Sequence, residues 1–328
     1  MSDKQHTSAL KLAKPLWESW SWLLKWLLML GAYVFLVYKL ITFNQYDELI
    51  AAWRNMSFIH FGWLLAILTL LPLNWLLEAF KWKMLTSNIQ QISIKQAAKA
   101  VLAGISTGFF TPNRLGEFVG RLLFLHPENR KAGVTLSAVN SLTQNLVMAL
   151  CGIPACVLFF SHTDRTSQSK VIWFIALVIV CAGLLSLIYL ALPQISKKLS
   201  KSKFADKVTP FTTCLTEFTP VQLSEIMLVS FFRYSVFSLQ FGFMLYFFEI
   251  NLTPIEALIA IPTTYLFVTF TPAFAFSEVA IRSSYAVLVI GTFSGQIVGI
   301  ALAGLCIWLV NFVIPMLVGS AVVLRSKP

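Results

Sequence analysis

The sequence predicts an all-α protein that spans a membrane several times as one helix bundle. Of its 328 residues, 57% are hydrophobic and 12% are charged, whereas an average soluble domain has about 25% charged residues. Apolar runs of about 20 residues, the length needed to cross a bilayer, recur along the whole chain. We therefore expect one membrane domain, 20–323, between a cytoplasmic N-terminal segment, 1–19, and a cytoplasmic tail, 324–328.

Six uninterrupted apolar runs predict membrane-spanning helices. The first run is too long for the apolar part of a signal peptide and has no small-residue cleavage site, so we interpret it as a retained helix. The predicted spans are 20–42, 60–80, 132–160, 171–192, 221–249 and 294–323.

Two further apolar stretches, 96–125 and 254–291, are each interrupted near the middle by a Thr-Pro pair. The pairs are Thr111–Pro112 and Thr271–Pro272. Proline lacks the N–H that continues a helix and disfavours helical backbone in the residue before it. Since most of the arms are too short for a full crossing, we predict two re-entrant pairs of half-helices, each entering and leaving on one side.

The basic residues support this topology. With both termini in the cytoplasm, nearly all basic residues outside the membrane segments fall on the cytoplasmic side, and only Arg54, Arg165 and Lys170 fall outside. Positive charge is enriched in cytoplasmic loops of membrane proteins. The net charge of +11 is therefore explained by membrane topology, and no nucleic-acid partner is predicted.

The two broken stretches carry related motifs. The first reads FFTPNRLGEFVGR and the second TFTPAFAFSEVAIR, so each has Phe-Thr-Pro followed by Glu and, four residues later, Arg. The pairs Glu117/Arg121 and Glu278/Arg282 each fall on one helix face, with Glu on the favourable N-terminal side. Together with their flanking spans, the motifs predict two repeats, about 60–160 and 221–323, of inverted topology.

The pattern T-P-x-R-L-G-E-x-x-x-R, from Thr111 to Arg121, resembles the membrane domain of lysylphosphatidylglycerol synthases, the flippase-like or multiple peptide resistance factor family. The resemblance implies a part that moves charged phospholipids between leaflets, without the soluble synthase domain. The second motif departs from the family, because AFAFSE stands where a Gly-rich stretch is usual. We expect the protein in the bacterial cytoplasmic (inner) membrane.

Charged and amide side chains inside these apolar segments are the candidate substrate-binding residues. Charges inside a membrane are costly and usually face the bundle interior or a water-filled cavity. Arginine can bind phosphate with two parallel hydrogen bonds, and half-helix N-termini favour anions. The alternative is that the Glu/Arg pairs are local salt bridges and that the amides only join helices. Glu78 fits either this site or the membrane interface. The candidates are Arg114, Glu117, Arg121, Arg233, Glu278, Arg282, Asn140 and Gln144.

These features favour a lipid translocator that moves an anionic or aminoacylated phospholipid, or a polyprenyl-linked lipid. One alternative is a membrane-embedded transferase acting on a polyprenyl-phosphate or phospholipid substrate. Another is a membrane partner of a separate lipid synthase or glycosyltransferase. No catalytic motif stands out, so an enzyme is the less favoured reading. No metal or cofactor is predicted, and a homodimer is compatible with the sequence.

Overall fold

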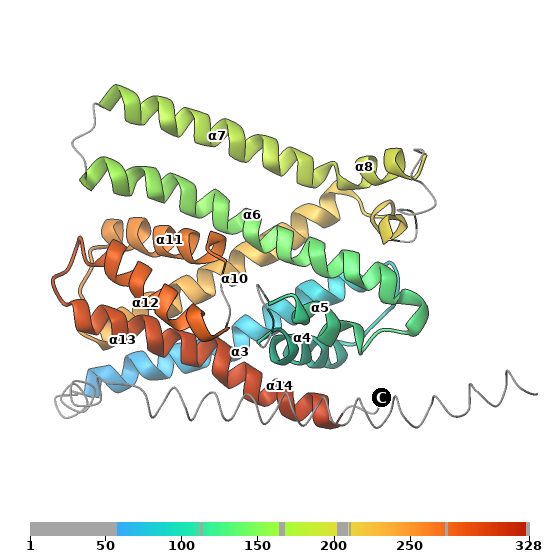
Figure 1. Cartoon of the computed structure of the whole chain (residues 1–328), viewed down its shortest axis with the longest axis horizontal. Helices are drawn as coiled ribbons and strands as arrows, with labels where there is room; N and C mark the ends of the chain where they lie inside the picture. The colour runs from blue at the N-terminus through green and yellow to red at the C-terminus, as the bar shows by residue number, and fades with distance from the viewer. Residues whose placement is uncertain are drawn as a thin grey trace, which may run out of the picture.

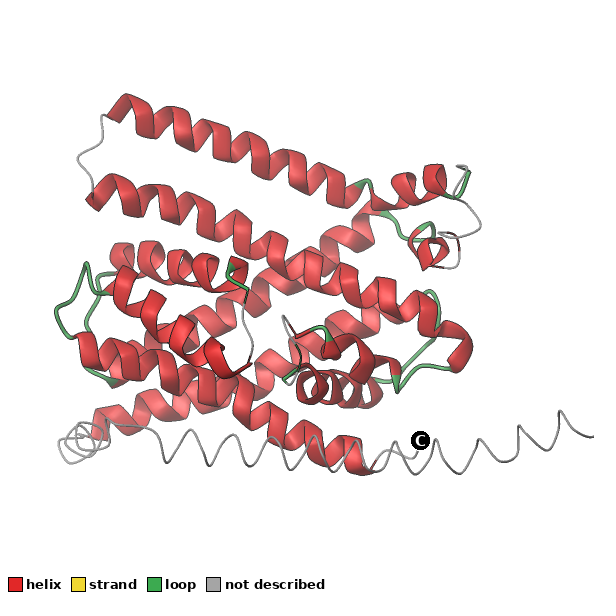
Figure 2. Ribbon diagram, viewed as in Figure 1, coloured by secondary structure: helices red, strands yellow, loops and turns green. Residues whose placement is uncertain are grey.

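The computed structural model describes residues 58–109, 111, 114–163, 168–201, 209, 211–272 and 275–325. Every regular element in these ranges is a helix and none is a strand, which confirms the all-α prediction. The predicted span 20–42, the N-terminal segment and Pro112 lie outside the described residues. Figures 1 and 2 show long helices that cross one another, with shorter helices packed between them.

Four described helices are long and apolar enough to span a membrane, and a bent pair adds a fifth candidate. They coincide with the predicted spans after the first, which confirms a polytopic membrane bundle. The four are α3 (Phe58–Thr86), α6 (Arg130–Thr163, entered through η2, Pro127–Asn129), α10 (Pro220–Phe247) and the continuous helix Ile297–Arg325. The bent pair is α7 (Gln168–Leu190) and α8 (Leu192–Leu199), which meet at 55°.

The outward faces of these helices carry large apolar side chains. On α7, for example, Trp173 is 77% exposed and Leu187 is 64% exposed, and on α3 Leu65 is 64% exposed. Water would disfavour so much exposed apolar surface, whereas lipid chains solvate it. The apolar exterior is therefore the surface that faces the bilayer.

The last long helix contains an irregular turn. It is built from α13 (Ile297–Trp308), the π-helical turn η4 (Leu309–Val313) and α14 (Ile314–Arg325). A π turn accommodates an extra residue in an α-helix and is frequent at functional sites. It turns the side chains of η4 to a face that a regular helix would not offer them.

Two pairs of short helices occupy the predicted broken stretches. They are α4 (Ile94–Gly108) with α5 (Gly116–Leu122), and α11 (Pro254–Phe270) with α12 (Ala275–Ile290). The backbone of Thr271 is extended (φ −91°, ψ 119°), so α11 ends just before Pro272 as the sequence predicts. The arm expected to reach residue 125 ends its helix at Leu122, because the chain must leave the helix ahead of Pro127.

The first helix of each pair starts with the same cap. Ser93 accepts a hydrogen bond from the Gln96 backbone N–H, and the Gln96 side chain bonds back to Ser93. Thr253 and Glu256 form the equivalent capping box at the start of α11. Such a box satisfies two backbone donors that a helix start otherwise leaves free. Thr219 and Gln222 form a third such box at the start of the long helix α10.

Glycines let α5 fold back along α4. A Cβ on Gly104 would lie 3.1 Å from Cγ of Arg121, and one on Gly108 would collide with Cγ of Glu117. Residues later in α4 therefore contact residues earlier in α5, which means that the two helices run in opposite directions. The two arms form an antiparallel hairpin, in which close backbone approach depends on residues without a Cβ.

The two halves of the bundle pack in a reciprocal way. The long helices α3 and α10 cross in extensive contact. The first short helix of the first half, α4, packs on α14 of the second half, and α11 of the second half packs on α6 of the first. Figure 1 shows these pairs side by side. The polar residues of both halves are thereby brought to the centre.

Candidate functional site

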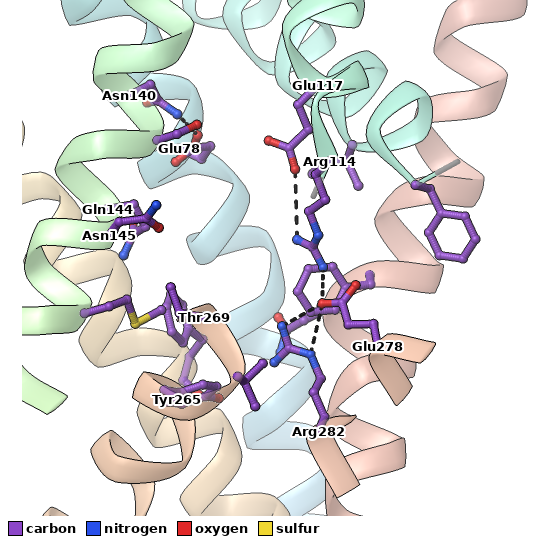
Figure 3. A pocket seen from close by; sticks show the side chains of 18 of the residues that line it. Glu78, Arg114, Glu117, Asn140, Gln144, Asn145, Tyr265, Thr269, Glu278 and Arg282 are labelled. Carbon is purple, nitrogen blue, oxygen red and sulfur yellow. Dashed lines mark hydrogen bonds and ion pairs between the residues drawn. The ribbon is translucent and has the colours of Figure 1, made fainter. Parts of the chain in front are cut away.

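A cavity of about 550 Å3 lies at the centre of the bundle, between the short helix pairs and the long helices α3, α6 and α10. In Figure 3, acidic and basic side chains of the short pairs form one wall, and amides of α6 lie on the opposite side. All eight candidate residues line it, namely Arg114, Glu117, Arg121, Asn140, Gln144, Arg233, Glu278 and Arg282. Thr111, Thr271 and Pro272 of the predicted breaks line it as well.

Glu78 of α3 is the centre of one charged cluster. Its Oε1 accepts hydrogen bonds from Nη2 of Arg121 at 2.7 Å and from Nδ2 of Asn140 at 2.8 Å. Its Oε2 lies 2.9 Å from Nζ of Lys81 and 3.3 Å from Nη1 of Arg233. Glu78 is 3% exposed, so it is a buried partner of the site and not an interfacial residue.

Lys81 departs from its predicted place. The predicted span 60–80 leaves Lys81 just beyond its cytoplasmic end, but α3 continues to Thr86 and buries Lys81 completely. A buried ammonium group is costly unless it is paired. Glu78 provides that pairing, and Oε1 of Gln144 lies 3.5 Å from Nζ of Lys81. Lys81 therefore positions Glu78 from behind the cavity wall.

Arg233 of α10 joins this cluster from the second half of the chain. Its Nε donates to Asn74 at 2.9 Å and its Nη1 donates to Oε1 of Gln144 at 3.1 Å. Arg233 lies within the predicted span 221–249, and its charge has hydrogen-bond partners on α3 and α6. Asn74 also connects this cluster to the last span, since its Nδ2 donates to Oδ1 of Asn311 at 3.2 Å.

Glu278 of α12 is the centre of the second cluster. Its Oε1 accepts from Nη2 of Arg282 at 2.9 Å and from Nη2 of Arg114 at 2.5 Å. The bond to Arg282 is the i, i+4 pair expected from the sequence, and Glu117 and Arg121 form the corresponding pair at 3.4 Å. Arg114 connects the two halves, because it comes from the first hairpin and Glu278 from the second pair.

The backbone of Arg114 is strained. Its φ angle is 59°, in the left-handed region that non-glycine residues adopt at a cost of about 1–2 kcal/mol. The conformation aims the side chain across the cavity toward Glu278, as Figure 3 shows. The protein thus tolerates an unfavourable backbone at the residue that joins the two hairpins.

Phe312 of η4 lies beneath two guanidinium groups. The Cζ of Arg114 is 3.7 Å from its ring centroid and the Cζ of Arg282 is 4.6 Å away. A guanidinium group is attracted to an aromatic face, by about 0.5–2 kcal/mol. The ring belongs to the π turn and gives both arginines a common support.

Four polar side chains of α6 line the cavity, and only two of them bond to the charged clusters. Asn140 bonds to Glu78 of α3 and Gln144 bonds to Arg233 of α10, so both amides join α6 to its neighbouring helices. Ser141 and Asn145, one helical turn apart, also line the cavity. Asn145 is exposed although it lies mid-way along an apolar span, and its side chain has no bonding partner among the described residues.

Basic groups outnumber acidic groups in this assembly. Four arginines and three glutamates line the cavity, and Lys81 stands behind them. Every one of the three carboxylates is already paired with at least two cations. Two buried donor atoms of Arg121, Nε and Nη1, have no hydrogen-bond partner within the described ranges. The assembly therefore has an excess of positive charge and two unpaired buried N–H donors.

Sequence reasoning missed several members of the site. Lys81, Asn74, Asn311 and Phe312 were not among the candidates. Asn311 carried the clearest signal, as a single amide in the apolar run WLVNFVIP. Among the described residues, no group of three or more His, Cys, Asp or Glu side chains is placed to hold a metal ion.

Comparison with known proteins identifies the family. The model of the lysylphosphatidylglycerol synthase TM region matches residues 22–319. No curated protein and no solved structure gives a significant match to the chain. The family match includes both helix pairs and all charged residues of the cavity. Because it covers most of the sequence, the chain belongs to the family of the lysylphosphatidylglycerol synthase TM region.

Proposed function

We propose that the protein moves a phospholipid or lipid-linked headgroup between the leaflets of a bacterial cytoplasmic membrane. The observation that carries this proposal is the central cavity, lined by four arginines and three glutamates inside a bundle with an apolar exterior. Burying so many charges in a membrane is costly and marks a site that handles a polar group. The headgroup passes through the cavity while the acyl chains stay in the bilayer.

The arginines are suited to the phosphate of such a headgroup. A guanidinium group is planar, always charged and has five N–H donors, so it binds phosphate with two parallel hydrogen bonds. Arg114 and Arg282 both border the cavity, with side chains 33% and 15% exposed, and they share one carboxylate, that of Glu278. Arg121 and Arg233, whose side chains are 4% and 24% exposed, hold the Glu78 cluster together.

The movement itself is assigned to two inverted repeats. The matching motifs and the reciprocal packing of α4 on α14 and α11 on α6 support this assignment. In secondary transporters, one repeat rocks against the other around a central site and opens it to alternate sides. The Arg114–Glu278 bond connects the repeats, so it must break and reform during such a motion.

A labelling experiment tests the inverted arrangement. Single cysteines replace Gln91 and Glu128, which flank the first helix pair, and Asn251 and Gln296, which flank the second. In intact cells, a membrane-impermeant thiol reagent is expected to label the cysteines at 251 and 296 and to spare those at 91 and 128. Labelling of one member of either pair without the other excludes a re-entrant hairpin there.

One native cysteine, Cys214, is expected not to react with the thiol reagent and can be kept in the labelling experiment. Cys214 lies between the membrane helices α8 and α10, and burial raises the pKa of its thiol to about 11. Since the thiolate is the reactive form, Cys214 is expected to stay unlabelled at pH 7. The other native cysteines, Cys151, Cys156, Cys181 and Cys306, are replaced by alanine or serine.

Reconstitution tests the transport function. Purified protein in vesicles is expected to speed the exchange of a fluorescent phospholipid between leaflets, measured by quenching the outer leaflet. Arg282→Ala and Arg121→Ala are expected to abolish the protein-dependent rate, with Arg130→Ala, an exposed residue at the start of α6, as matched control. Wild-type rates in the folded Arg282 variant would exclude the proposed role of the cavity.

A role as membrane partner of a separate lipid synthase is the second candidate. The observation that favours it is the description of the family as the TM region of a synthase. Co-purification of a soluble aminoacyl- or glycosyl-transferring protein with the tagged chain supports this candidate. Formation of a modified lipid by the purified chain alone, from labelled phospholipid or polyprenyl phosphate, identifies it instead as a transferase.

A further inference from the structure

We propose that α8 (Leu192–Leu199) lies along the membrane surface beside α7 and binds anionic phospholipids there. Its exposed apolar face enters the acyl chains, and the lysines next to that face bind the lipid phosphates. This contact is made with the lipid surface and lies outside the central cavity, which no residue of α8 lines. It goes beyond the proposed function and does not depend on whether the protein moves lipids.

A proline turns the chain away from α7 at the start of α8. Pro193 has no N–H for the bond that would continue α7, and its ring clashes with the carbonyl four residues earlier. The two helices consequently meet at 55°, although only Ala191 separates them. Figure 1 shows α8 as a short separate helix beyond the end of α7. Because α7 is part of a candidate span, a helix that bends away at its end runs along the membrane surface.

One face of α8 is fixed to the rest of the protein. Pro193 and Ser196 are buried, and Oγ of Ser196 donates to the carbonyl of Thr212 at 2.6 Å. The short helix η3 (Thr213–Leu215) follows Thr212 directly and contacts both α8 and α6. These contacts fix the rotation of α8 about its axis. Its other faces therefore point in defined directions.

A second face of α8 exposes large apolar side chains. Ile195 is 43% exposed, and Leu199, one helical turn later, is 37% exposed. Leu187 and Ile188, near the end of α7, are 64% and 55% exposed and belong to the surface that faces the bilayer. Only two turns separate Ile188 from Ile195. The acyl chains that cover the end of α7 are therefore expected to cover the apolar face of α8 as well.

The third face of α8 is basic. Lys197 and Lys198 are exposed, as is Lys201, which lies just after the helix, and the chain has no acidic residue from 190 to 201. Lysine stems lie along apolar surface while their ammonium groups reach the headgroups. This end of α7 is on the side predicted to be cytoplasmic, where anionic lipids attract each nearby lysine and strengthen binding about fivefold. The basic face therefore favours anionic over zwitterionic lipids.

Quenching by lipid chains tests the contact. Ile195→Cys, in the cysteine background of the labelling experiment, carries a fluorophore on the purified full chain in phosphatidylcholine vesicles. The vesicles include brominated phosphatidylserine or brominated phosphatidylcholine as the quencher. Both lipids are expected to quench, and the anionic lipid is expected to do so several-fold more efficiently at equal content. The difference should shrink in about 1 M salt, which screens charges beyond roughly 3 Å.

Lysine variants assign the preference for anionic lipid. In the protein with Lys197→Gln, Lys198→Gln and Lys201→Gln together, the two brominated lipids are expected to quench equally, while quenching itself remains. Lys95→Gln with Lys99→Gln, at exposed residues of α4, is the matched control and keeps the preference. An unchanged preference in the triple variant overturns the lysine assignment.

Two other results overturn the proposal outright. Quenching at position 195 by water-soluble iodide, but by neither lipid, places this face in water. Quenching by none of the three means that protein covers the face, for example a second copy of the chain. A fluorophore in place of Trp173, which is 77% exposed near the other end of α7, is the positive control for lipid contact. Failure of the reconstitution assay, with quenching as expected, excludes the translocator and leaves the α8 contact standing.

Discussion

Nη2 of Arg121 lies 2.7 Å from Oε1 of Glu78, although 43 positions separate the two residues in the chain. This bond ties the first hairpin to the long helix α3. Around the same carboxylate gather Lys81 and Arg233, so three cations from three helices depend on one glutamate. Glu78 therefore stabilises the inner wall of the cavity in addition to bordering it.

Replacing Glu78 by alanine is expected to destabilise the fold strongly. The change leaves three cations without their carboxylate, and removing one partner of a buried ion pair costs about 3–5 kcal/mol. Thermal unfolding in detergent measures the effect. Glu128→Ala, at an exposed residue of η2, provides the matched control with little change. In the pair Glu78→Gln and Lys81→Met, the double variant is expected to be more stable than Glu78→Gln alone, since one unpaired charge is removed.

Glycine substitutions test the antiparallel hairpin. A Cβ on Gly120 would collide with the Ala103 backbone and the Thr107 side chain, so Gly120→Ala is expected to destabilise by about 1–3 kcal/mol. Gly183 of α7 has no neighbouring atom within 4 Å of such a Cβ. Gly183→Ala should therefore be neutral or stabilise by up to about 1 kcal/mol. Equal unfolding temperatures for the two variants would contradict the close packing of α4 and α5.

Removing the aromatic ring of Phe312 is expected to loosen both guanidinium groups. Phe312→Leu keeps an apolar side chain but loses the cation–π attraction of about 0.5–2 kcal/mol, so binding of an anionic phospholipid should weaken by about 2- to 30-fold. Phe312→Tyr keeps the ring and should retain most of the affinity. Phe232→Leu, exposed on the outside of α10, serves as control. Unchanged binding by Phe312→Leu would show that the ring does not orient the arginines.

Two substitutions of Arg114 test its strained backbone, because they are expected to have the same effect on lipid movement but different effects on stability. Both Arg114→Ala and Arg114→Gly remove the bond to Glu278 and are expected to lose lipid movement. Glycine accepts a φ of 59° without the steric cost that alanine has, so the glycine variant should be the more stable by about 1 kcal/mol. Comparison of the two unfolding temperatures provides the measurement. A more stable alanine variant would contradict the left-handed geometry.

Local sequence rules predicted the parts of the fold that depend on neighbours in the chain. Thr271–Pro272 ends α11 where proline chemistry requires, and Glu278 with Arg282 bond at the spacing of one helical turn. The lengths of the apolar runs predicted the long helices, because a run of this kind is also a property of neighbouring residues in the chain. The bond between Arg121 and Glu78 obeys no such rule, because it depends on how the hairpin docks on α3.

The position of Phe312 was also beyond local rules. This side chain lies within the π turn, whose register differs from that of a regular helix, and it lines the cavity. Nothing in the run LVNFV distinguishes a π turn from an α turn. Lys81 was misplaced for a related reason, since a lysine near a span end reads as a loop residue until the buried carboxylate beside it is seen.

The shared bond of Arg114 and Arg282 to one oxygen of Glu278 makes that carboxylate a tethered counter-ion. Any incoming anion competes with a group held permanently at the site, whose effective concentration far exceeds that of a dissolved salt. Chloride has one charge and no directional acceptors, so it competes poorly with the carboxylate of Glu278 for the two arginines. A phosphodiester that engages both arginines at once competes better with the carboxylate. When the carboxylate of Glu278 binds the arginines again, it displaces the phosphodiester. The same exchange of partners therefore accounts for both binding and release of the anion.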